Sequence, residues 1–358
     1  MINVTKTYLP DVEKFKQYVD KIFDSGWITN NGQMVKELEK RLKEYLGVKH
    51  IILVSNGTLA LQVAYKLLDL TGEVITTPFS FVATTSSLVW EGLKPVFVDI
   101  DSDTFCLDYN KLEEKITRNT SAILPVHVFG NGCEVEEIDK IAQKYDLKVI
   151  YDAAHAFGVK YKGESILNYG DVSVLSFHAT KVFHTIEGGA LIINEDQLYD
   201  KARKLINFGI TGPDTIDGIG INAKMNEFQA AMGLCVLDDI ENIIKGRQKV
   251  YENYLNEFSG INQIKLQVIN KNCTQNYSYF PIVVSSEKVL LKIKEKLEAN
   301  NIYPRRYFYP SLNTLSYVDE YEANNSYNIS NNILCLPIYY NLELEQQQKI
   351  IKIIKENV

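Results

Sequence analysis

Lys181 stands in the middle of the apolar stretch "DVSVLSFHATKVFHTIEGGALII", which runs from Asp171 to Ile193. A lysine taken out of water loses affinity for its proton, and its amine becomes a nucleophile suited to Schiff-base chemistry. An exposed lysine in a loop is the alternative interpretation. The apolar neighbours and the glycine pair Gly188-Gly189 favour a buried, reactive amine.

Asp152 is a second candidate, because it ends the strand-like run in "VIYDAAHAFG". Ligands of open α/β sheets bind at the C-terminal ends of the strands. A buried carboxylate there needs a cation or a hydrogen-bond donor. An N-cap for the following segment is the competing interpretation. His155, three residues later, is suited to hydrogen-bond either a ligand or the backbone.

The loop "VSNGTLAL" follows a strand and opens a helix, so Gly57 and Thr58 are placed to bind an anion. Taken alone, the loop is better explained by an Asn-Gly turn used only for its geometry. No Walker lysine or dinucleotide-binding glycine pattern occurs, which argues against ATP and NAD. Combined with a strand-end aspartate and a strand-end lysine, however, the loop predicts a pyridoxal 5'-phosphate site.

These residues need a scaffold whose strands end side by side. Apolar, β-branched runs alternate with helix-like segments from about residue 50 to residue 240, which predicts a mainly parallel mixed sheet sandwiched by helices. Two helices, over residues 11–26 and 32–47, precede it, and each ends at a glycine. We therefore expect an α/β protein with a large domain over residues 1–240 and a smaller C-terminal α/β domain over residues 241–358.

Composition argues against nucleic-acid-binding, membrane and disulfide-rich classes of protein. The 358 residues carry a formal charge of −7, which argues against a surface built for nucleic acid. The N-terminus lacks a signal-peptide pattern and no run of 18 apolar residues occurs, so we expect a cytoplasmic protein with no membrane partner. The five cysteines are odd in number and scattered, which favours reduced packing residues over disulfides or a zinc site.

The chain resembles the sugar aminotransferases of the DegT/DnrJ/EryC1/StrS family. The motifs "SNGTLAL", "TTPFSFVAT", "PVFVDID", "DAAHAFG", "SFHATK", "EGGA" and "GINAKMNEFQAAMG" occur in the family's order, and the similarity runs from "GWITNNG" to "LCLPIY". The resemblance implies a type I aminotransferase fold, pyridoxal 5'-phosphate as the cofactor, and a homodimer with shared active sites.

The resemblance also assigns residues. It makes Lys181 the catalytic lysine that holds the cofactor, Asp152 the partner of the ring nitrogen, Phe81 the aromatic ring on the cofactor's face, and His155 a neighbour of its 3-hydroxyl. The residues expected at the phosphate are Gly57, Thr58, Ser176 and, from the neighbouring subunit, Asn222. Two positions depart from the family pattern: Val182 stands where asparagine is common, and Lys224 stands where arginine is usual.

The segment "NNIYPRRYFYPSLN" offers cations and phenols suited to a pyrophosphate or a sugar. From composition alone an exposed polar turn is equally favoured. The family resemblance favours substrate binding. The residues expected at the substrate are Trp27, Thr29, Asn30, His184, Arg305, Arg306, Tyr307 and Tyr309.

The resemblance implies transfer of an amino group from L-glutamate to a dTDP-linked keto-6-deoxyhexose. The motifs are most similar to those of enzymes that act at C4 of dTDP-4-keto-6-deoxyglucose, in O-antigen or lipopolysaccharide biosynthesis. Amination at C3 of a 3-keto sugar is the alternative. A non-catalytic regulatory protein of the same fold is a rival of another class, and the intact Lys181, Asp152 and phosphate loop argue against it. Dehydratase relatives carry histidine in place of the lysine, which this chain retains.

Overall fold

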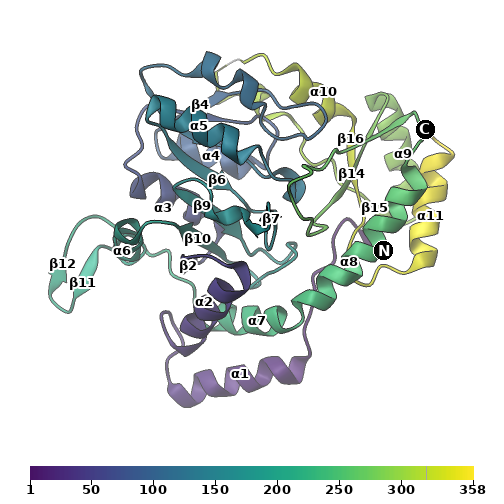
Figure 1. The fold of residues 1–358 in the computed structure, drawn as a ribbon. Helices are drawn as coiled ribbons and strands as arrows, with labels where there is room; N and C mark the ends of the chain where they lie inside the picture. Colours follow the sequence, from purple (N-terminus) through teal and green to yellow (C-terminus); the bar gives the residue numbers. More distant parts are fainter. Residues whose placement is uncertain (320) are drawn as a thin grey trace.

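The computed structural model describes residues 1–319 and 321–358, which form a large domain around a central sheet and a smaller domain beside it (Figure 1). The expected α/β class with a mainly parallel mixed sheet is confirmed. The strands of the central sheet are β2 (His50–Val54), β3 (Glu73–Thr76), β4 (Lys94–Phe97), β5 (Thr120–Leu124), β6 (Lys148–Asp152), β9 (Val172–Ser176) and β10 (Gly189–Ile193).

The strand order β2-β10-β9-β6-β5-β3-β4 determines where the ends of the strands meet. Neighbouring strands from β9 to β4 run parallel, whereas β10 runs antiparallel to both β9 and β2. β6 and β9 are adjacent near the centre of the sheet, so the C-terminal ends that carry Asp152 and Ser176 lie side by side.

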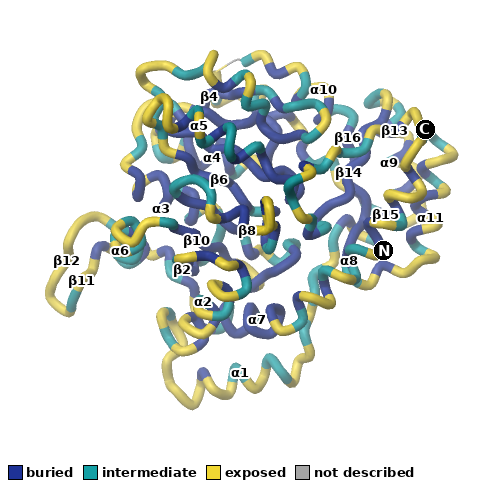
Figure 2. Tube along the Cα trace, viewed as in Figure 1, coloured by how far each residue is buried: buried dark blue, intermediate teal, exposed yellow. Residues whose placement is uncertain are grey.

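Apolar residues on both faces of the sheet explain why the strands read as continuous hydrophobic runs. Ile51 and Leu53 pack into one core, and Ile52 and Val54 pack into the other, as the alternation along a strand requires. Figure 2 shows the strands as the buried centre of the domain. The helices of the domain are α2 (Gln33–Leu46), α5 (Val135–Tyr145) and α7 (Glu227–Asp238) on one face, and α3 (Gly57–Leu67), α4 (Val82–Trp90) and α6 (Asp196–Leu205) on the other.

The helix α1 (Val12–Ser25) packs on α7 outside this layer (Figure 1). The expected glycine ends of α1 and α2 are confirmed. Gly26 and Gly47 follow the two helices with φ of 66° and 64°, the left-handed conformation that glycine adopts at least cost.

The smaller domain has its own core around an antiparallel sheet of three strands. Its elements are α8 (Ile240–Phe258), β13 (Ile264–Leu266), β14 (Phe280–Val284), α9 (Glu287–Glu298), β15 (Ile302–Tyr303), α10 (Asn324–Asn332), β16 (Ile333–Leu336) and α11 (Leu344–Lys355). The first strand of the chain, β1 (Ile2–Asn3), pairs in parallel with β15, so the N-terminus lies on this domain and not with the residues that follow it (Figure 1).

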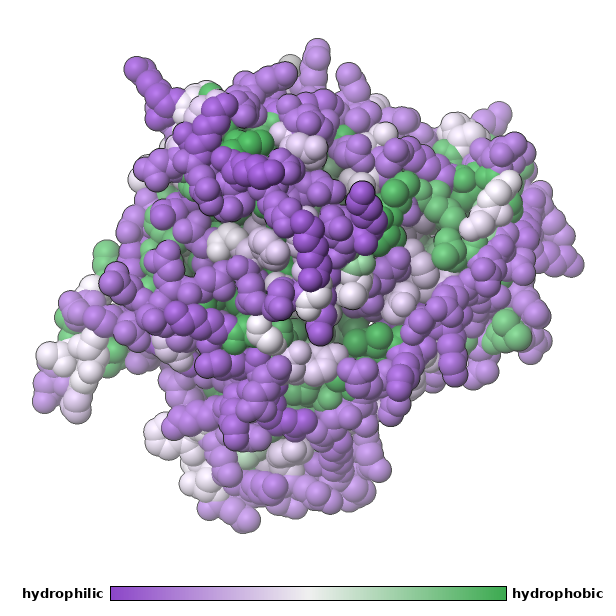
Figure 3. Space-filling view, viewed as in Figure 1, coloured by the Kyte–Doolittle hydropathy of each residue, from purple (hydrophilic) through white to green (hydrophobic). Residues whose placement is uncertain are grey.

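Two short hairpins complete the fold: β7 (Lys160–Tyr161) with β8 (Glu164–Ser165), and β11 (Ile210–Gly212) with β12 (Thr215–Ile216). The β11–β12 hairpin projects from the body (Figure 1), and apolar atoms stand on its surface (Figure 3). The side chains of Ile216 and Ile219 are 74% and 91% exposed there. Among the described residues, no helix has the length and apolarity needed to span a membrane.

Candidate active site

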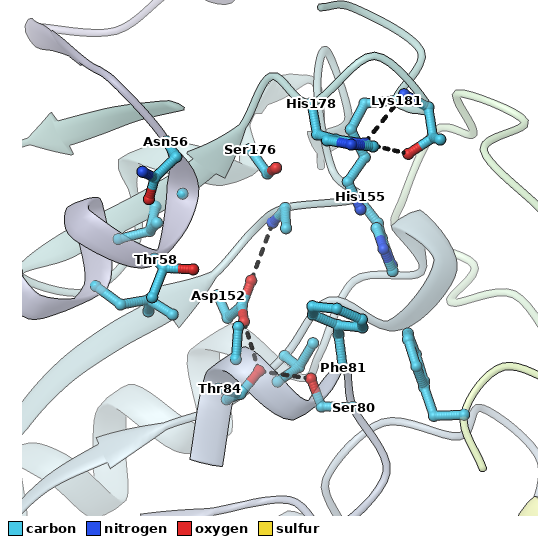
Figure 4. Close-up of a pocket in the computed structure, with 18 of the residues that line it drawn as sticks. Asn56, Thr58, Ser80, Phe81, Thr84, Asp152, His155, Ser176, His178 and Lys181 are labelled. Atoms are coloured by element: carbon cyan, nitrogen blue, oxygen red, sulfur yellow. Dashed lines mark hydrogen bonds between the residues drawn. The ribbon is translucent and has the colours of Figure 1, made fainter. Parts of the chain in front are cut away.

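A cavity of about 310 Å³ opens at the C-terminal ends of β6 and β9. The first turn of α3, the start of α4 and the loop that follows β9 line it, and the C-terminal half contributes Tyr279, Tyr307 and Phe308. Figure 4 shows polar side chains from these separate elements around one space. The expected cofactor-binding residues that line the cavity are Gly57, Thr58, Phe81, Asp152, His155, Ser176 and Lys181.

Lys181 lies in the loop between β9 and β10, where its backbone N–H donates to the carbonyl of His178 at 2.9 Å. The next residues, Val182 and Phe183, are buried, and Phe183 stacks on Phe157 with ring centroids 4.6 Å apart. Buried neighbours thus fix the position of a partly buried lysine. Burial lowers the pKa of Lys181 to about 8, against an opposing effect of the Asp152 carboxylate.

Asp152 is buried at the end of β6 and accepts two hydrogen bonds, from the Thr84 hydroxyl at 2.8 Å and from the Ala154 backbone N–H at 3.2 Å. Because the single proton of Thr84 is used on Asp152, the Ser80 hydroxyl donates to Thr84 at 2.7 Å. Burial raises the pKa of Asp152, and these hydrogen bonds and Lys181 oppose the shift. A buried carboxylate of this kind fits the protonated ring nitrogen of pyridoxal phosphate.

The first turn of α3 has the features of an anion site. The Asn56 side chain accepts from the Leu59 N–H at 2.8 Å and so caps the helix. A Cβ at Gly57 would lie 3.1 Å from that of Ser176, so glycine lets the turn approach the end of β9. The hydroxyls of Thr58 and Ser176 have no hydrogen-bond partner among the described residues, and a phosphate would use both.

His155 is buried among aromatic rings. Its ring is parallel to those of Phe129 and Phe308, with centroids 6.2 and 5.8 Å away. The backbone N–H of Phe129 donates to its Nδ1 at 3.3 Å, so the neutral ring carries its proton on Nε2. Burial and then Lys181 lower the pKa of His155, which keeps it neutral and leaves one N–H for a ligand.

Eight of the expected residues lie outside this cavity, and three of them, Arg305, Arg306 and Tyr309, line a second cavity described below. His184 is buried, and its Nε2 lies 2.8 Å from the carbonyl of Tyr8 while its Nδ1 accepts from the Ile186 N–H. The four that line neither cavity besides His184 are Trp27, Thr29, Asn30 and Asn222.

The loop with Trp27 and Asn30 is held by the buried carboxylate of Glu227, which accepts from the N–H groups of Gly32 and Met34. Asn222 is exposed near the base of the β11–β12 hairpin, where it pairs with Asn207. Neither the loop nor Asn222 reaches the cavity of its own chain.

The two arginines of "YPRRYFYP" have different surroundings. Both line a second cavity of about 380 Å³, which shares Ser80, Phe81, Tyr307 and Phe308 with the first. Arg306 donates to Glu287 at 2.7 Å and to the carbonyl of Asn331 at 3.0 Å, and it covers the ring of Tyr309. Arg305 is exposed, and its guanidinium has no acidic partner among the described residues. Of the two, Arg305 is therefore the one whose guanidinium is available to a ligand.

Sequence reasoning missed several residues of the cavity wall: Ser80, Thr84, His178, Glu187, Tyr279 and Phe308. The histidine pair that flanks Lys181 was the available signal. His178, three residues before the lysine, lines the cavity, whereas His184, three residues after it, is packed against the N-terminal segment.

Comparison with known proteins agrees with this geometry. Residues 10–355 match the DegT/DnrJ/EryC1/StrS aminotransferase family. Two relatives named dTDP-4-amino-4,6-dideoxy-D-glucose transaminase, from Shigella dysenteriae and Escherichia coli, are 45% and 44% identical over 99% of this chain and 98% of their own. The structure of DesI, determined in the presence of its TDP-sugar product, matches with a TM-score of 0.94 at 30% identity, over 99% of this chain and 92% of that one.

Proposed function

The chain belongs to the DegT/DnrJ/EryC1/StrS aminotransferase family, and we propose that it transfers an amino group from L-glutamate to C4 of dTDP-4-keto-6-deoxyglucose. The aminotransferase class rests on the family match over nearly the whole chain. The substrate is proposed because two relatives more than 40% identical bear the name of the corresponding 4-amino sugar transaminase. The main structural support for the proposal is that Lys181, Asp152 and the α3 turn line one cavity.

The residues present fit pyridoxal 5'-phosphate, which when bound supplies an electron sink for the carbon that loses its proton. Lys181 would hold the cofactor covalently and, once released, carry a proton between carbon atoms. Because its pKa is about 8, roughly a tenth of the free lysine is neutral at pH 7. An unshifted lysine would be almost entirely protonated at that pH.

Asp152 would keep a proton on the ring nitrogen, and the Ser80-Thr84 relay would keep Asp152 ionised. The Nε2–H of His155 is suited to donate to the phenolic oxygen of the cofactor, because its tautomer is fixed by Phe129. The α3 turn with Thr58 and Ser176 would hold the phosphate.

We further propose a homodimer in which Asn222 reaches the neighbour's site. The support is that Asn222 lies outside its own cavity, beside a projecting hairpin whose apolar residues face solvent in one chain. We also propose that the reaction takes place in the cytoplasm. That it is a step of O-antigen or lipopolysaccharide biosynthesis is proposed from the family resemblance.

Incubation with the 4-keto sugar and the 3-keto sugar in separate reactions tests the substrate. With L-glutamate as donor, we expect an amino sugar only from the 4-keto compound, with the new C–N bond at C4 by NMR. A product from the 3-keto sugar alone would favour C3 amination. A protein that binds pyridoxal phosphate but aminates neither sugar would support the regulatory alternative.

A further inference from the structure

Two side chains of the cavity wall, His178 and Glu187, have no role in the chemistry described so far. They flank the loop that carries Lys181, and Figure 4 shows His178 at the rim of the cavity beside that lysine. The Nε2 of His178 lies 3.5 Å from an Oε1 of Glu187, and the two side chains are 47% and 57% exposed. Both therefore retain room for another partner.

The orientation of the His178 ring is fixed by Thr180. The backbone N–H of Thr180 donates to Nδ1 at 3.3 Å, and the hydroxyl of the same residue lies 2.8 Å from that nitrogen. A neutral ring that accepts at Nδ1 carries its proton on Nε2. The nitrogen that faces Glu187 is therefore a hydrogen-bond donor.

The backbone of Glu187 is equally well fixed. Its carbonyl accepts from the Thr185 hydroxyl and from the side-chain amide of Gln229 on α7, each at 2.8 Å. The next residue, Gly188, has no room for a Cβ, which would lie 1.9 Å from the Thr185 hydroxyl oxygen. The carboxylate of Glu187 has no other partner than His178 among the described residues. It is an acceptor next to the Nε2 donor of His178.

A donor and an anionic acceptor side by side match a hydroxyl group, which accepts one hydrogen bond and donates another. They do not match the carboxylates of glutamate or a pyrophosphate, which Glu187 would repel. We propose that His178 and Glu187 together bind one hydroxyl of the hexose ring, and so distinguish the sugar from the amino donor in a cavity that both must enter. This inference rests on the proposed function.

Binding of dTDP-glucose and of dTDP to the holoenzyme, measured by titration calorimetry, tests it without turnover. dTDP-glucose has the hexose hydroxyls but no keto group, and dTDP lacks the hexose. Glu187→Ala should weaken dTDP-glucose binding about tenfold or more and leave dTDP binding unchanged, since a hydrogen bond to a charged group is lost. Glu187→Gln keeps an acceptor oxygen without the charge and should lose less.

Glu195→Ala is the matched control, because it removes an exposed carboxylate outside the cavity and should bind both ligands as the wild type does. The visible absorption of each variant shows whether the cofactor is retained. Equal affinity of Glu187→Ala and wild type for dTDP-glucose, or equal weakening for both ligands, would overturn the inference and leave the proposed function standing. If the wild type itself bound dTDP-glucose no more tightly than dTDP, both the inference and the proposed sugar substrate would fail.

Discussion

The Thr84 hydroxyl donates to the Asp152 carboxylate across 2.8 Å, and in doing so joins the first turn of α4 to the end of β6. Asp152 is buried, and that burial raises its pKa. The bond from Thr84 stabilises the ionised form and counters the shift. Thr84 is thus a positioning residue that acts on the cofactor ring through Asp152.

Thr84→Val should reduce kcat/KM about tenfold to a hundredfold, because a hydrogen bond to a charged group contributes about 1.5–3 kcal/mol. Without the bond the pKa of Asp152 rises further, so less of the carboxylate is ionised at neutral pH. The loss should therefore shrink as the pH is raised, which a pH profile would show. Ser80→Ala, one step further along the relay, should have a smaller effect. A pH-independent loss in Thr84→Val would point to altered packing instead.

The amine of Lys181 should govern how fast the apoprotein takes up pyridoxal phosphate. Only the neutral amine reacts, so the rate should rise with pH and level off above about 8, the pKa that burial gives this lysine. Stopped-flow measurement of the visible absorption follows the uptake. Asp152→Asn removes the negative charge that raises the lysine pKa, and should move the midpoint to lower pH. After borohydride reduction the cofactor should map to Lys181; a midpoint near 10.5, or attachment elsewhere, would contradict the assignment.

Substitutions of Arg305 and Arg306 should have different effects, the first on substrate binding and the second on stability. Arg305→Gln should raise the KM for the nucleotide sugar about tenfold and spare the glutamate half-reaction, since only the nucleotide sugar carries a pyrophosphate. Arg306→Gln should instead lower the free energy of unfolding by about 1–3 kcal/mol, because its bonds to Glu287 and Asn331 are lost. Denaturant titration distinguishes the two. The same stability loss in both variants would refute the division of roles.

Subunit exchange tests the shared active site. Asn222→Ala and Lys181→Ala should each be inactive or nearly so, the first through weakened phosphate binding and the second through loss of the amine. If Asn222 serves the neighbouring chain, a mixed dimer of the two variants contains one site with both residues intact. We expect mixing to restore activity, with differently tagged subunits to confirm exchange. Persistent inactivity in confirmed mixed dimers would argue that the site is complete within one chain.

Sequence patterns predicted the central sheet well, because a strand buried on both faces has to be apolar at nearly every position, as "HIILV" is. The helix ends at Gly26 and Gly47 were equally accessible, since a left-handed cap favours glycine. The sequence of the β11–β12 hairpin shows neither a continuous apolar run nor a capping pattern that predicts it. Its strands span only three and two residues, and its apolar side chains are exposed in the single chain.

The sequence predicted which strand-end residues face the cavity, but it did not predict which loop side chains do. Asp152 and Ser176 follow from the strands that carry them. His178 and His184 lie at equal distances from Lys181 in a segment without helical or strand periodicity, so no pattern tells which one faces the cavity. In the structure His184 contacts the carbonyl of Tyr8 in the N-terminal segment, and Ile186, two residues later, adopts a left-handed φ of 69°.

The path of the N-terminal segment has a mechanical consequence. The chain leads from β1 to α1 through the N-terminal segment, and α7 leads into α8 at Asp239. The Tyr8 hydroxyl donates to the Asp239 carboxylate at 2.9 Å, while the Tyr8 carbonyl contacts His184 in the loop of the reactive lysine. Tyr8 therefore connects the junction of α7 and α8 to the loop that positions the amine. A displacement of α8 relative to α7 would reach that loop through this one side chain and its carbonyl.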